Sequence, residues 1–248
     1  MNLKRIRGQI LASILVNAIY EMKNYPVVLL NTVLAPLSFL TLIWFVSQGS
    51  LLGPAIIGGL IMTMFSSGTS LQADLSHLKN DFKLQDMVVS SPTSASVYVV
   101  GIAISELIYS LPAIAILSTL FFFFVPVTLI QLGGIIAVLA FVFITSVSLG
   151  FALATISSDI VQSFAFTRLL TTLFSTLAPV YYPITYIPEP YRFLAYLSPT
   201  TYAAQIAQNL SGALVSSTEE LIVDWTVLIC LTAVFLWIGM SKSRWREK

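Results

Sequence analysis

Six stretches of mostly apolar residues dominate the sequence, and each is close to the length of about 20 residues that a transmembrane helix requires. They cover residues 27–46, 54–71, 97–124, 129–156, 161–181 and 221–240. Charged residues make up only 9% of the chain, against about 25% in soluble domains, so most of the surface must face lipid. The sequence therefore predicts an all-α membrane protein: one transmembrane domain, residues 1–248, with six transmembrane helices.

Lysine and arginine residues are concentrated on one side of these spans. Ten of the 12 precede the first span, separate the second from the third, or follow the sixth: Lys4, Arg5, Arg7, Lys23, Lys79, Lys83, Lys242, Arg244, Arg246 and Lys248. Such residues accumulate on the cytoplasmic side of membrane proteins. We therefore expect both termini to be cytoplasmic, in a multi-pass protein of the cell membrane.

The first 26 residues are too polar to span the bilayer. On a helix, Gln9, Ser13, Asn17, Tyr20 and Asn24 form one narrow polar stripe, with apolar residues elsewhere. A basic start and separate polar and apolar sides are typical of helices that lie at the membrane surface. Residues 1–26 are thus predicted to form an interfacial amphipathic helix. The alternative is that they only lead into the first span.

A charged segment, residues 72–96, separates the second and third spans. A short helix over 75–89 would end before Ser91-Pro92, because a residue that precedes proline avoids helical angles. The alternative is a solvated loop.

Two charged residues, Glu106 and Arg168, fall inside predicted spans. Charge in the membrane interior is costly and usually faces protein or water. The two side chains could form an ion pair, or each could reach the interface separately.

Small residues recur at every fourth position of the second and fourth spans: Gly59, Thr63, Ser67 and Ser146, Gly150, Ala154, Ser158. Such ridges let helices approach each other closely. A second interpretation is that hydroxyl groups of the second span, Thr63 and Ser67 among them, line a substrate path. Pro112 predicts a kink in the third span.

Two motifs carry a family resemblance. The first is residues 81–94, with Asp86 six positions before Pro92, followed by Gly101. The second combines Pro183 to Pro190 with Leu197-Ser198-Pro199-Thr200-Thr201-Tyr202. Together with the order of the six spans, these motifs resemble type-2 ABC exporter permeases over essentially the whole chain. One difference is Lys83-Leu84, where the family often has Gly-Thr.

The resemblance implies that two copies of a cytoplasmic ATP-binding subunit dock on the 72–96 loop, with ATP and magnesium on that partner. The docking residues would be Lys79, Asp81, Phe82, Lys83, Asp86 and Pro92. It also implies a pair of permeases, either a homodimer or a pair with a paralogue. The second and fifth spans would line the path, the fifth with Phe166, Thr171 and Phe174, which suits an amphipathic or lipid-like cargo such as a drug, lipid or glycan.

The segment before the last span, residues 182–220, is rich in tyrosine and proline. Tyrosine favours the membrane–water boundary, and the prolines divide the segment into pieces too short to span. As in the family, we expect a re-entrant helical hairpin. The alternative is a surface loop anchored by aromatic residues.

Several functions are excluded or disfavoured by residues that the sequence lacks. It has no G-x-x-x-x-G-K-[ST] run, so no P-loop can hold ATP. One cysteine, Cys230, and one histidine, His77, leave no disulfide and no cysteine–histidine zinc site. We expect no catalytic residues, no bound cofactor or metal, and no nucleic-acid partner. An ion-gradient-driven secondary transporter is the alternative, but it would normally need more intramembrane ionisable residues than Glu106.

Overall fold

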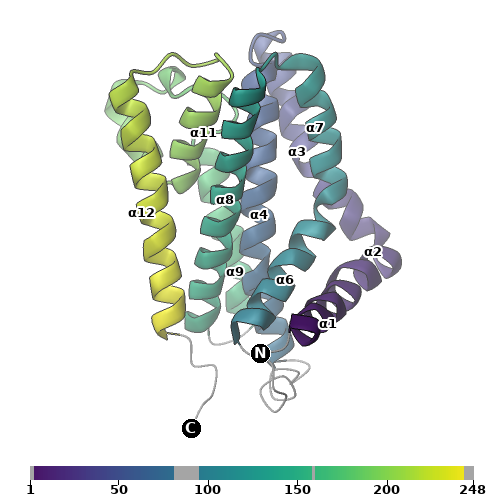
Figure 1. Cartoon of the computed structure of the whole chain (residues 1–248). Coiled ribbons are helices and arrows are strands. Elements are labelled where there is room, and N and C mark those ends of the chain that lie inside the picture. The colour runs from purple at the N-terminus through teal and green to yellow at the C-terminus, as the bar shows by residue number, and fades with distance from the viewer. Residues whose placement is uncertain (1–2, 81–94, 158–159, 243–248) are drawn as a thin grey trace.

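The computed structural model describes residues 3–80, 95–157 and 160–242. Within these ranges the chain is helical and has no strand, which confirms the predicted all-α class (Figure 1). The elements are α1 (Leu3–Ile14), the π-helical turn η1 (Leu15–Tyr20), α2 (Glu21–Asn24), α3 (Pro26–Ser47), α4 (Leu52–Asn80), α6 (Ala95–Tyr109), α7 (Leu111–Phe124), α8 (Leu129–Ile156), α9 (Ile160–Leu177), the 3-10 turns η2 (Ile184–Tyr186) and η3 (Glu189–Tyr191), α10 (Arg192–Ala195), α11 (Pro199–Leu210) and α12 (Thr218–Lys242).

The α4 helix forms the centre of the bundle, with α3, α6, α7, α8, α9 and α11 around it. In α4, 78% of an apolar 18-residue stretch within Leu52–Leu75 is buried, compared with 6% of such a stretch within Leu29–Ser47 of α3. The largest fully buried side chain is Phe65, in the middle of α4. Leu37, Leu40 and Ile43 of α3 pack against the core, and its exposed apolar side chains are left for lipid or for another protein.

Four helices are long and apolar enough to cross a membrane, or five when α6 and α7 are counted as one bent span; this count covers the described ranges only. The α9 helix, which overlaps the predicted fifth span, is not among them. It has 18 residues, ends at Leu177, and carries Gln162, Arg168 and several hydroxyl residues, which lower its hydropathy. Residues 178–181 follow it in irregular, buried backbone.

The predicted third span is broken at Ser110, between α6 and α7, where the axis bends by 54°. Pro112 lies in the first turn of α7. Proline is tolerated there because the first backbone N–H groups of a helix have no intrahelical acceptor. The predicted kink is confirmed, and α6 packs against both α4 and α1 (Figure 1).

The N-terminal helix α1 packs along α6. The middle of the predicted polar stripe faces protein: Ser13 Oγ lies 3.4 Å from Ser105 Oγ, and Asn17 Nδ2 donates to Ser13 Oγ at 3.2 Å, whereas Tyr20 and Asn24 are exposed. Apolar side chains such as Leu11 and Leu15 are exposed. The segment is thus helical, as predicted, and its apolar side faces outward.

The segment that was expected to form a loop from residue 72 continues as helix. The α4 helix extends to Asn80, with Gln72 fully buried. A polar residue is stable there because its side chain is hydrogen bonded: Gln72 Nε2 donates to Ser157 Oγ at 3.1 Å, and Gln72 Oε1 accepts from Thr167 Oγ1 at 3.1 Å. The expected helix over 75–89 lies mostly outside the described residues.

The segment before α12 closes over one end of the bundle. The α11 helix is buried against α8, α12 and α4, and Gln208 Nε2 donates to the backbone oxygens of Val180 (3.2 Å) and Tyr182 (3.4 Å). Gly58 of α4 allows this backbone to approach, since a Cβ there would overlap the Val180 carbonyl group.

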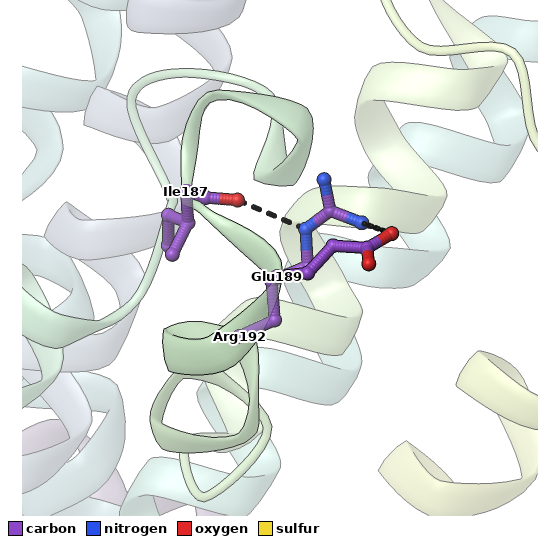
Figure 2. Close-up of polar contacts among 3 residues, drawn as sticks. All are labelled: Ile187, Glu189 and Arg192. Carbon is purple, nitrogen blue, oxygen red and sulfur yellow. Dashed lines mark hydrogen bonds and ion pairs between the residues drawn. The ribbon is translucent and has the colours of Figure 1, made fainter.

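The expected hairpin is realised with one helical arm only. The α11 helix forms that arm, whereas the segment before it consists of the short turns η2, η3 and α10, because prolines interrupt it. Figure 2 shows how these turns are held: Arg192 Nε donates to the Ile187 oxygen at 2.9 Å, and Arg192 lies 3.6 Å from Glu189 in an ion pair.

Candidate functional site

A cavity of about 430 Å³ lies between α4, α3, α9 and the α6–α7 break; we call it the polar cavity. Its size is within the range of about 300–1,000 Å³ that is common for small-molecule sites. It is lined by Glu21, Asn31, Thr32, Ala35, Pro36, Phe39, Met62, Thr63, Ser66, Ser67, Ser70, Ala73, Asp74, Glu106, Tyr109, Ser110, Phe164, Thr167, Thr171, Ser175 and Tyr181.

Hydroxyl groups cover much of the wall formed by α4 and α9. Thr63 Oγ1 donates to the Gly59 oxygen at 2.7 Å, and Thr171 Oγ1 donates to the Thr167 oxygen at 2.8 Å. A hydroxyl that donates to its own helix keeps lone pairs with which it can accept. The same kind of bond is made by Ser66, Ser70 and Ser175. This wall therefore presents mainly hydrogen-bond acceptors to the cavity.

Three carboxyl groups form one end of the polar cavity, which we call the acidic end: Glu21 of α2, Asp74 of α4 and Glu106 of α6. Glu106 is 8% exposed. Its carboxyl group is hydrogen bonded to that of Asp74. A carboxylate can only accept, so a hydrogen bond between these two groups requires a proton on one of them.

Two buried hydroxyl groups beside the acidic end lack a partner. Ser67 and Tyr109 are 3% and 8% exposed, and both line the polar cavity. Neither Ser67 Oγ nor Tyr109 Oη has a hydrogen-bond partner in the part of the chain that the structure describes. Leaving a buried polar group unpaired costs about 1–3 kcal/mol.

Apolar side chains line the remainder of the cavity. Phe39 of α3 stacks on Tyr181 with ring centroids 5.1 Å apart and the planes within 9° of parallel, and Met62 and Phe164 also line it. The cavity thus combines an acidic end, an acceptor-rich wall and an apolar wall. This arrangement suits an amphipathic molecule better than a uniformly polar one.

The structure brings together some of the residues proposed from the sequence as path lining. Thr63, Ser67 and Thr171 line the polar cavity, whereas Phe166 and Phe174 do not. Phe174 instead packs edge to face on Phe65, with centroids 5.4 Å apart. Their role as a substrate path stays a prediction.

The expected pair of Glu106 and Arg168 is not formed. Arg168 is exposed on α9 and does not line the polar cavity, and the described residues contain no ion pair between the two. Glu106 interacts with Asp74 instead. The reason is that the bend at Ser110 and the length of α4 bring a second acid, not a base, beside Glu106.

The sequence reasoning missed Asp74 and Glu21, which had been assigned to a loop and to a surface helix. A signal was present for Asp74: Thr63, Ser67, Ser70 and Asp74 follow one another at spacings of four, three and four residues. That spacing places all four on one helix face, so the polar stripe of the second span continues to Asp74. No local pattern marked Glu21, because only the packing of α1 and η1 on α6 brings it to the cavity.

The predicted docking residues are outside this site. Asp81, Phe82, Lys83, Asp86 and Pro92 lie outside the described residues. The backbone of Lys79 belongs to the last turn of α4.

No group of three or more potential metal ligands is present in the part of the chain that the structure describes. Glu21, Asp74 and Glu106 therefore do not form a ready metal site.

Comparison with known proteins shows which family the chain matches. The sequence model of the family described as "ABC-2 type transporter" matches residues 9–210, which is most of the chain and includes every residue that lines the polar cavity. No curated protein matches the sequence.

Proposed function

This chain belongs to the ABC-2 type transporter family, a family of membrane permeases that is not itself catalytic, and from that premise we propose that it exports an amphipathic or lipid-like molecule with energy from a separate ATPase subunit. The observation that carries the proposal is the polar cavity, whose polar and apolar walls lie inside the region that the family match covers. The cargo would be a drug, lipid or glycan.

The proposed orientation puts both termini in the cytoplasm, with six spans that include α9. Two observations support it. Lysine and arginine concentrate near the two termini and the α4–α6 connection. In addition, the start of α1 and the end of α12 lie at the same end of the bundle (Figure 1).

In this arrangement α1 lies in the cytoplasmic interface, because the apolar Leu11 is exposed together with the basic residues Lys4 and Arg7, while Ser13 faces α6. The acidic end of the polar cavity then faces the cytoplasm, where the cargo would enter.

Energy would enter through the charged segment that follows α4. Two copies of a cytoplasmic ABC ATPase, which would hold ATP and magnesium, would bind Lys79, Asp81, Phe82, Lys83, Asp86 and Pro92. The α4 helix is continuous from this segment to the polar cavity, so a movement at its end can be transmitted to Asp74 and Ser67. A second permease, identical or paralogous, would cover the exposed side of α3 in the cell membrane.

Purification of the tagged permease from its native membrane in mild detergent tests the proposal. We expect recovery of a subunit that contains a P-loop and hydrolyses ATP. The charge-reversal variants Lys79→Glu, Asp81→Lys and Asp86→Lys should reduce that recovery, whereas Glu219→Lys, on an exposed residue at the opposite end of α12, should not. Recovery of the permease alone, or equal effects of all four variants, would contradict the proposal.

The orientation can be tested through the single cysteine. Cys230 is exposed on α12, and Cys230→Ser provides a background in which single cysteines can be introduced. A cysteine at Ser241 should react with a membrane-impermeant maleimide only in inverted vesicles, and one at Thr185 only in right-side-out vesicles. The reverse pattern would overturn the orientation.

A further inference from the structure

We propose that the exposed side of α1, η1 and α2 binds the headgroups of anionic phospholipids and thereby holds α1 against α6. We call this surface the basic–apolar side; it consists of Arg7, Leu11, Leu15, Val16, Ile19 and Lys23. That the lipids belong to the cytoplasmic leaflet rests on the proposed orientation. The preference for anionic lipid does not, and it can be measured in either orientation.

The basic–apolar side is one continuous surface because of the π-helical turn. Arg7, Leu11, Leu15, Ile19 and Lys23 follow one another at intervals of four residues, and all five are exposed. In a regular α-helix, with 3.6 residues per turn, such positions drift around the axis. The i→i+5 bonds of η1 accommodate more residues per turn. Lys23 therefore stays on the same side as Arg7, with apolar residues between them.

The residues that follow indicate that lipid, and not water, covers this surface. Tyr20 and Tyr25 are 59% and 56% exposed, on either side of Lys23, and tyrosine favours the membrane–water boundary. The chain then enters α3, where Val27 and Leu30 are exposed as well. The basic–apolar side thus continues into the apolar side of a helix long and apolar enough to cross a membrane.

The charge of this segment favours an anionic lipid. Residues 1–25 contain four basic residues, Lys4, Arg5, Arg7 and Lys23, and one acidic residue, Glu21, which lines the polar cavity. Neither Arg7 nor Lys23 forms an ion pair with another residue in the described ranges. Basic residues beside an apolar helix face attract anionic headgroups, and their long stems can lie along the apolar surface while the charge reaches a phosphate.

Contact with α6 connects this surface to the polar cavity. A Cβ added to Gly101 of α6 would lie 3.1 Å from Ser13 Cβ, so α1 approaches α6 closely there. Ser13 Oγ also lies 3.4 Å from Ser105 Oγ, and the next residue, Glu106, lines the cavity. A ligand that binds only the packed arrangement stabilises it by mass action. Anionic lipid should therefore stabilise the packing of α1 on α6.

The experiment measures which lipid lies beside α1, in the full-length permease in phosphatidylcholine nanodiscs. Ala12→Cys, at an exposed position beside Leu11, is made in the Cys230→Ser background and labelled with bimane. The quenchers are phosphatidylglycerol and phosphatidylcholine that carry the same nitroxide-labelled acyl chain, compared at equal mole fraction. We expect phosphatidylglycerol to quench at least about threefold more strongly, because Arg7 and Lys23 enrich it locally.

Matched variants separate charge from apolar contact. Arg7→Gln/Lys23→Gln should lower the quenching ratio of the two lipids to about one, whereas Arg7→Lys/Lys23→Arg should preserve it. Leu11→Ser should weaken quenching by both lipids alike. Bimane on the native Cys230, which is exposed on α12, should give a ratio of about one. Added sodium chloride should lower the ratio at position 12, because salt screens exposed charges.

Hydrogen exchange measures the effect on packing. Residues 95–109 of α6 should exchange at least about twofold more slowly when phosphatidylglycerol is present than in phosphatidylcholine alone. Arg7→Gln/Lys23→Gln should remove this difference. All of the charge substitutions are on exposed residues, so the variants should fold as the wild-type protein does.

Specific outcomes would overturn the inference. A quenching ratio of about one in the Ala12→Cys protein, or a ratio that Arg7→Gln/Lys23→Gln leaves unchanged, would show no recognition of anionic lipid. Absence of quenching by either lipid would show that protein covers this side. Loss of the ratio in sodium phosphate but not in sodium chloride of equal ionic strength would make it a site for free phosphate. Equal exchange of α6 in both lipids would refute the effect on packing.

These outcomes are independent of the tests of the proposed function. Nanodiscs present both leaflets to the protein, so the lipid preference does not depend on which side is cytoplasmic. Recovery of the ATPase subunit and the maleimide labelling can fail while the lipid preference holds, and the reverse is equally possible.

Discussion

Gly68 of α4 and Gly150 of α8 lie directly against each other. A Cβ added to Gly150 would be 3.0 Å from the Gly68 carbonyl oxygen, and one added to Gly68 would overlap the Ser146 side chain and approach the Val147 nitrogen to 2.8 Å. The small-residue ridge predicted for α8 at Ser146 and Gly150 thus forms a real contact. Its partner on α4 is Gly68, whereas Gly59 packs against Leu117 of α7. Thr63 and Ser67 face the cavity instead.

Gly68→Ala should destabilise the protein by about 1–3 kcal/mol, the usual cost of overpacking a dense contact. The cost arises because α4 and α8 must move apart. The midpoint of SDS-induced unfolding in mixed micelles measures it. The matched control is Gly133→Ala on α8, where an added Cβ meets nothing within 4 Å; there we expect no loss and a gain of up to about 1 kcal/mol from helix propensity. Equal effects of the two changes would contradict the close contact.

Gln72 should couple α4 to α9 through its bond with Thr167. Interhelical hydrogen bonds in membranes contribute about 0.6 kcal/mol on average, so Gln72→Leu should cost about 1 kcal/mol for its two side-chain bonds. Thr167→Val should have a smaller effect, and the double variant should be less destabilised than the sum. The same unfolding measurement serves for this double-mutant cycle. Strict additivity would show that the bond between Thr167 and Gln72 contributes nothing.

Gln208→Leu should loosen the segment before α11. The change removes the donor for the Val180 and Tyr182 oxygens, and an unpaired buried group costs about 1–3 kcal/mol. Faster hydrogen exchange is expected at residues 178–186, with little change in α8. Asn209→Leu, which loses a bond to the Leu214 oxygen on the other side of α11, is the control and should not affect residues 178–186. Uniformly faster exchange through the bundle would point to global destabilisation instead.

Arg192 should contribute more to the stability of the turns η2 and η3 than Glu189, its partner in the ion pair. Glu189 is largely exposed, and exposed ion pairs contribute little because water screens them. Glu189→Gln is therefore expected to change stability by less than about 0.5 kcal/mol. Arg192→Ala also loses the bond from Nε to the Ile187 oxygen and should increase proteolytic cleavage near residues 187–192. A larger effect of Glu189→Gln than of Arg192→Ala would reverse this ranking.

Local composition was sufficient to predict the helices, because a chain that crosses lipid must satisfy its backbone hydrogen bonds within each segment. The α8 helix begins and ends where its apolar stretch does, and Pro112 marked the bend of α6 against α7. The α9 helix, which carries Arg168, is not among the helices that are long and apolar enough to cross a membrane, although the sequence predicted a span there.

The acidic end of the polar cavity depends on packing that no single segment encodes. Glu21, Asp74 and Glu106 come from three helices that are far apart in the sequence. They meet because α4 stays helical beyond Gln72 and the chain bends at Ser110, so that α6 packs against α4 and α1. The sequence offered Arg168 as the natural partner for Glu106, since opposite charges attract. The tertiary structure places an acid there instead, because the direction of each side chain is decided by how the helices pack and not by the charge that it carries.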